Sequence, residues 1–68
     1  MKMIEISNLR AAREAKGWSL AELAKRTGVH YTSLGRAERG ERNLLASNYV
    51  RVARALGTTV DALLEDDQ

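Results

Sequence analysis

Four glycines divide this chain into short segments, and their spacing is the feature that most limits its fold. Gly17, Gly28, Gly40 and Gly57 each follow a run rich in Ala, Leu, Arg, Lys and Glu, which are strong helix formers. Because glycine adopts the left-handed conformation that ends a helix without steric cost, each one predicts a helix C-terminus. No segment alternates apolar and polar residues as a strand does, and there is no proline. The pattern predicts an all-α fold of short helices.

Five helices are expected in one domain that spans residues 1–68. The hydroxyl of Ser19 can cap the second helix while Glu22, three residues on, reaches back to it in a capping box. Thr59 is the expected N-cap of the fifth helix. The fourth helix has apolar residues at the i, i+3, i+4, i+7 spacing of a buried stripe. The expected bounds are about 7–16, 19–27, 31–39, 46–56 and 60–65.

Length and composition limit the function classes. A chain of 68 residues buries only about 60% of its unfolded surface, which leaves little room for an internal active-site cavity. It has no cysteine, and its first residues lack the apolar run of a signal peptide. No stretch approaches the ~18 apolar residues of a membrane span. We therefore expect a soluble cytoplasmic protein.

The net charge of +2 conceals a division along the chain. All 11 Lys and Arg but only five of the nine acidic residues lie in residues 1–60, so this part carries +6 and the last eight residues carry −4. A basic body favours a polyanionic partner, while an ordinary solvated mixture of charges is the alternative.

The segment from Leu20 to Arg39 carries the most information. Two short helices joined by a tight turn cross closely, which requires glycine at the turn and a small residue at the crossing. Gly28 and Ala24 meet these requirements. The apolar residues that flank them are Leu23, Val29, Leu34 and Ala37.

This segment and its surroundings resemble the Cro and lambdoid-repressor helix-turn-helix family, also called the XRE family. The matching residues are Leu9, Arg10, Arg13 and Gly17, the segments 19–24 and 27–29, Leu34, and the segments 38–43 and 53–57. The resemblance implies a compact five-helix domain with its helix-turn-helix at about 20–39. It also implies a homodimer that places this motif's second helix, the recognition helix, in the major groove of a palindromic operator. Such a protein regulates transcription, often as a repressor, and is nucleoid-associated when bound to DNA.

The resemblance assigns DNA contacts to particular residues. Tyr31, Thr32 and Arg36 match the positions that face base edges, and the forked guanidinium of Arg36 suits guanine O6 and N7. We expect these three residues to share one outward face of the helix. The alternative is an ordinary solvated face. Contacts to phosphates are implied for Ser19, His30, Arg39, Arg42 and Asn43.

Three positions depart from the family or from helix propensity. Leu20 stands where the family often has a glutamine that touches DNA, and His30 stands at the cap where serine is common. We interpret His30 as a cap or a phosphate donor. Gly35 lies inside the recognition helix, where glycine costs about 1 kcal/mol relative to alanine. It either lets the backbone sit deep in the groove or is simply tolerated.

Two further expectations concern how the domain is held together. The resemblance pairs Arg13 with Glu38 beneath the recognition helix. Val60, Leu63 and Leu64 are predicted to form the dimer interface, because a short fifth helix is not expected to shelter all three. Closure of the monomer core by these residues is the alternative.

Enzymatic function is not expected. The single histidine and scattered carboxylates supply no convergent catalytic group and no metal site, and no cofactor is predicted. The competing hypothesis is an antitoxin or other protein-interaction module of the same fold, with a toxin or other protein as partner. Restriction-modification controllers, phage repressors and small antitoxins all fit this length.

Overall fold

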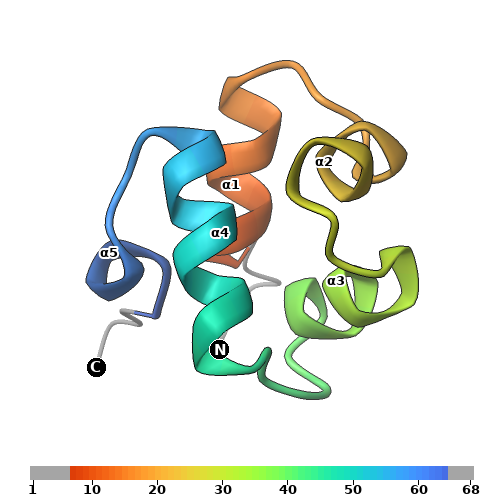
Figure 1. The fold of residues 1–68 in the computed structure, drawn as a ribbon, viewed down its shortest axis with the longest axis vertical. Coiled ribbons are helices and arrows are strands. Elements are labelled where there is room, and N and C mark those ends of the chain that lie inside the picture. Colours follow the sequence, from red (N-terminus) through yellow and green to blue (C-terminus); the bar gives the residue numbers. More distant parts are fainter. Residues whose placement is uncertain (1–6, 65–68) are drawn as a thin grey trace, which may run out of the picture.

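Five helices follow one another over residues 7–64, the part of the chain that the computed structural model describes (Figure 1). This part contains no strand, and all four helix-ending glycines have positive φ, between 70° and 77°. The all-α fold expected from the glycine spacing is confirmed. Position 65 of the expected fifth helix lies outside the described residues. The helices are α1 (Asn8–Ala15), α2 (Leu20–Thr27), α3 (Tyr31–Glu38), α4 (Ala46–Leu56) and α5 (Val60–Leu64).

Side-chain caps begin three of the helices. The hydroxyls of Ser7, Ser19 and Thr59 each accept a hydrogen bond of 3.0–3.1 Å from the backbone amide three residues on. The expected capping box at Ser19 is wrong in its second half. The Glu22 carboxylate lies 2.7 Å from Arg26 Nε instead, because an arginine four residues on offers a charged partner.

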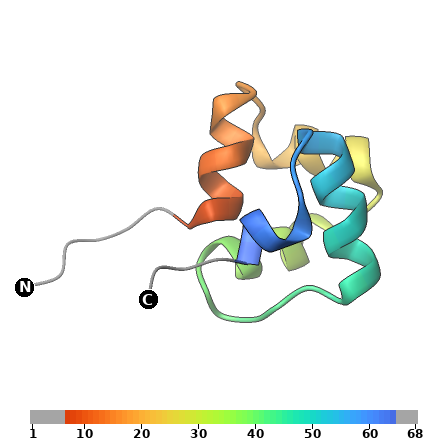
Figure 2. The ribbon, with the colours of Figure 1, turned by 90° about the vertical axis from the view of Figure 1, so that its left-hand side faces the viewer.

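The core lies where all five helices meet. Leu23 of α2, Leu34 of α3 and Val52 of α4 are its fully buried centre. The stripe predicted on α4 faces this centre, as Tyr49 and Leu56 of that helix are also buried. Figure 2 shows α1 and α4 on opposite sides of the domain, with α5 between them. Helix α5 contacts both neighbours, which explains how so short a helix reaches the core.

That position of α5 corrects the expectation for its apolar residues. Leu63 is only 7% exposed and belongs to the monomer core, and Val60 is half-buried against it. Leu63 is therefore not available as a dimer contact, because α1 and α4 already cover it. Leu64 is 49% exposed and faces solvent. Among residues 7–64, no helix is long and apolar enough to cross a membrane.

Candidate nucleic-acid interface

Thr27 and Gly28 form the turn that connects α2 to α3. The hydroxyl of Thr27 donates to Leu23 O at 2.8 Å and accepts from the amide of Val29 at 3.1 Å. Gly28 has φ +76°, and its amide donates to Ala24 O at 2.9 Å. Sequence reasoning identified the glycine but missed the role of Thr27. The available signal was a threonine in the last helical turn, where its hydroxyl can bond the carbonyl four residues back.

Arg13 supports α3 from below. Its Nε lies 2.6 Å from Glu38 Oε2 and its Nη2 lies 2.9 Å from Glu38 Oε1, while Nη1 donates to Trp18 O at 2.8 Å. The side chains are only 12% and 7% exposed. The hydrogen bond to Glu38 raises the pKa of Arg13 above its ordinary value. One guanidinium thus connects α1, the segment before α2, and the last residue of α3.

The outward face of α3 differs from the expected one. A rotation of about 100° per residue places Thr32 about 40° and Ser33 about 60° from Arg36, whereas Tyr31 lies about 140° away. All four side chains are exposed. The expectation that Tyr31 shares the face of Arg36 is therefore wrong, and Tyr31 is exposed because it is the first residue of the helix. Sequence reasoning missed Ser33, which faces the same side as Arg36.

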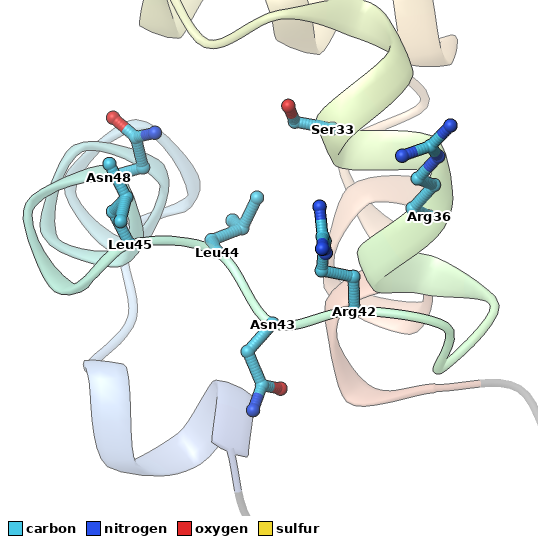
Figure 3. Close-up of a pocket in the computed structure, with 7 residues that line it drawn as sticks. All are labelled: Ser33, Arg36, Arg42, Asn43, Leu44, Leu45 and Asn48. Atoms are coloured by element: carbon cyan, nitrogen blue, oxygen red, sulfur yellow. The ribbon is translucent and has the colours of Figure 1, made fainter.

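An open pocket of about 310 Å³ lies beside this face (Figure 3). It is bounded by α3, the segment after it and the first turn of α4. Figure 3 shows the side chains of Arg36 and Arg42 next to one another on one side of it. Neither guanidinium pairs with a carboxylate of residues 7–64. The lining residues are Ser33, Arg36, Arg42, Asn43, Leu44, Leu45 and Asn48.

Asn43 does not take the position expected of a phosphate contact. Its side chain points away from Arg36 and Arg42 in Figure 3, and its Oδ1 accepts a hydrogen bond of 3.4 Å from the Tyr49 hydroxyl. This bond engages the acceptor oxygen of the amide and not the nitrogen that would donate to a phosphate. The phosphate contact of Asn43 stays a prediction, with the side chain directed away from the two arginines.

Arg39 has an internal partner as well. Its Nε lies 2.7 Å from Glu41 Oε2, and its Nη2 donates to Glu41 Oε1 at 3.4 Å. This hydrogen bonding raises the pKa of Arg39 and lowers the pKa of Glu41 from their ordinary values. The positive charge of Arg39 is therefore largely compensated, in contrast to that of Arg42.

Ser19 and His30 lie at helix N-termini, the regions where backbone amides favour anions. The Ser19 oxygen accepts the capping bond, which leaves its O–H free to donate. His30 is the N-cap residue of α3, as interpreted from the sequence, but it caps through its backbone carbonyl, which accepts from the Leu34 amide at 3.0 Å, and its ring makes no capping hydrogen bond. Its exposed ring stays a candidate phosphate donor.

Gly35 faces the interior of the protein. It is buried, and a Cβ built there would lie 3.5 Å from Leu20 Cδ2 and 3.3 Å from Arg39 Nη1. The idea that Gly35 brings the backbone close to a groove is therefore wrong. The glycine lies beneath the Leu20 side chain, and this contact gives a packing reason for leucine where the family often has glutamine.

No group of three or more potential metal ligands comes together within residues 7–64. The arrangement instead offers the exposed face of α3 with Arg36, and Arg42 beside it in the next segment, both without an ion-pair partner among the described residues, and the buried Arg13–Glu38 pair anchors the helix. Such a face suits polyanion binding.

Comparison with known proteins gives a matching family model, two related sequences and one similar crystal structure. A family model described as helix-turn-helix matches residues 9–63. Control protein C.SmaI of Serratia marcescens is 39% identical over 64 residues, which are 94% of this chain and 76% of that protein. A hypothetical transcription factor of Neisseria meningitidis serogroup B is 40% identical over 57 residues, 84% of this chain and 54% of that protein. A crystal structure of the hypothetical transcription factor NHTF from Neisseria superposes with a TM-score of 0.81 at 32% identity, covering 100% of this chain and 91% of that one.

Proposed function

This chain belongs to the helix-turn-helix family of transcriptional regulators, and we propose that it binds double-stranded DNA in a sequence-specific manner as a homodimer. The single observation that carries the proposal is the position of Arg36, which is exposed on the outward face of α3 without an acidic partner among residues 7–64. Glu38, two residues on, is held by Arg13 and fixes the orientation of the helix.

We assign base readout to the outward face of α3. Arg36 donates two hydrogen bonds to guanine O6 and N7, which is the commonest specific contact in the major groove. Thr32 and Ser33 contact neighbouring base edges or methyl groups from the same face. Tyr31 contacts the DNA strand nearest the N-terminus of α3, because its side chain leaves the helix on a different side from that of Arg36.

Phosphate contacts come from positions around this face. Arg42 is the principal candidate because it lies beside Arg36 and has no carboxylate partner within residues 7–64. Ser19 and His30 add donors at the N-termini of α2 and α3. Arg39 contributes less, since Glu41 already occupies one edge of its guanidinium.

The proposed dimer contact no longer includes Leu63, which is buried, and uses the exposed part of α5. Leu64 is 49% exposed, and a twofold axis near it would make the contact self-complementary. Two copies of α3 spaced about 34 Å apart would then meet successive major grooves on one side of a palindromic site.

The similarity to a control protein favours the controller class among small regulators of this kind. One observation favours a second candidate function, binding of a partner protein such as a toxin. Leu45 is 72% exposed at the start of α4, outside the proposed dimer contact. An exposed leucine there suits an apolar partner surface.

Selection from a library of randomised duplexes tests the proposal. We expect enrichment of a palindrome whose half-sites are about 10 base pairs apart, with affinity that falls as salt increases. The absence of salt-dependent binding to any duplex would contradict the proposal and favour the partner-protein function.

A further inference from the structure

Glu41 places a carboxylate among the arginines of the proposed DNA interface. Its backbone amide donates to Arg36 O at 2.9 Å, which fixes the residue at the C-terminal end of α3. Its side chain is 53% exposed and that of Arg39 is 59% exposed, so the pair faces solvent. A negative charge at this place opposes the approach of DNA.

The Glu41 carboxylate contacts Arg39 much as a phosphate would. Both oxygens accept from one edge of the guanidinium, Oε2 from Nε at 2.7 Å and Oε1 from Nη2 at 3.4 Å. Arginine binds phosphates through the same paired donors. The hydrogen bonding from Arg39 is the first cause that lowers the pKa of Glu41, and attraction to Arg39 and Arg36 lowers it further.

Building on the proposed function, we propose that Glu41 is an internal substitute for a DNA phosphate at Arg39 and weakens binding to duplexes of every sequence. A phosphate at Arg39 must displace the carboxylate or approach with that negative charge close by. Because the pair is neutral, a phosphate contact there releases fewer counterions than a contact with a free arginine.

This role improves discrimination between DNA sites. Non-specific affinity comes almost entirely from phosphate contacts, whereas base contacts determine preference. Arg36 makes no ion pair with Glu41, so its donors stay available for a base. Weakening one phosphate contact lowers binding to competing genomic DNA while base readout is kept.

The variant Glu41→Gln tests the inference on the intact chain. We expect it to bind a labelled random-sequence duplex about 2- to 5-fold more tightly. The plot of log K against log salt concentration should steepen by about 1. A thermal melt should be nearly unchanged, because exposed ion pairs contribute little to stability.

The matched control is Glu14→Gln. It also removes one carboxylate from an exposed Arg–Glu pair, with Arg10 Nε and Glu14 Oε2 2.9 Å apart and exposures of 51% and 43%, but it lies on α1. We expect no change in its affinity or salt slope. The Arg39→Gln background is the second control, and there Glu41→Gln should give no gain.

Three results would overturn the inference alone: unchanged or weaker binding by Glu41→Gln, an equal gain in Glu14→Gln, or a gain that persists in the Arg39→Gln background. Failure of the unmodified chain to bind any duplex would overturn the proposed function, and this inference with it.

Discussion

Arg13 and Glu38 meet through two parallel contacts, Nε to Oε2 at 2.6 Å and Nη2 to Oε1 at 2.9 Å, although they are 25 residues apart in the chain. The third donor of Arg13 is used by Trp18 O. This pair joins the first helix to the end of α3, and so it couples the stability of the domain to the orientation of the face proposed to read DNA.

Removing one partner of this ion pair should be costly, because the other charge loses its counter-charge. Arg13→Ala or Glu38→Ala leaves a charge stranded in a site that is about nine-tenths covered, and each should lower the free energy of unfolding by about 3–5 kcal/mol. The double variant should lose clearly less than the two losses added together. Urea denaturation of the four proteins gives the coupling energy. Additive losses would contradict a direct interaction.

Thr27→Val should destabilise the turn between α2 and α3. Valine has a similar shape but neither bonds Leu23 O nor accepts from the buried amide of Val29, so we expect a loss of about 1–3 kcal/mol. Thr32→Val is the matched control because Thr32 is exposed on the same motif, and it should change stability by less than about 0.5 kcal/mol. Equal effects of the two substitutions would show that the Thr27 hydrogen bonds contribute nothing.

The local sequence determined much of the fold. Helix ends depend on residues within one turn, so the positive φ of Gly28 and the caps at Ser19 and Thr59 could be predicted without knowledge of the tertiary structure. The buried stripe on α4 follows from periodicity alone.

The remaining features depend on contacts between helices. The burial of Leu63 follows from the position of α5 against α1 and α4, which no residue of α5 specifies by itself. The sequence leaves Gly35 open between a groove role and simple tolerance, because its neighbour across the helix pair, Leu20, is known only from the fold. The direction of the Asn43 side chain, away from Arg42, likewise depends on Tyr49, six residues on.

Two glycine substitutions should have opposite effects on stability. Gly35→Ala places a Cβ at ordinary contact distance from Leu20 and near the flexible end of Arg39, so the gain in helix propensity should stabilise the domain by about 0.5–1 kcal/mol. Gly28→Ala keeps φ +76°, which L-residues adopt at a cost of about 1–2 kcal/mol. Thermal melts compare the two. DNA affinity should survive Gly35→Ala, and a large loss would restore the groove role that its burial argues against.

Leu64→Asp should disrupt the proposed dimer. A charge at the centre of the α5 contact should give a monomer by analytical ultracentrifugation and weaken DNA binding, because each monomer contacts only one half-site. Leu45→Asp is the control for mass, since that leucine is more exposed but lies at the start of α4. It should leave the mass unchanged. Its DNA affinity is no control, because Leu45 lines the pocket beside Arg36 and Arg42. A Leu64→Asp protein with the mass and affinity of the unmodified chain would contradict the interface.

We propose that α3 reads base sequence while its surroundings hold phosphates, and a comparison of Arg36→Ala with Arg42→Ala tests this division most directly. The affinity of each variant is measured for the selected palindrome, for a set of its single-base variants and for random duplexes, across a salt series. Arg36→Ala should lose about 1–3 kcal/mol on the palindrome and its preference at one base position per half-site. Arg42→Ala should weaken all duplexes alike and reduce the salt slope by about 1. Equal, sequence-independent losses for the two variants would contradict the account.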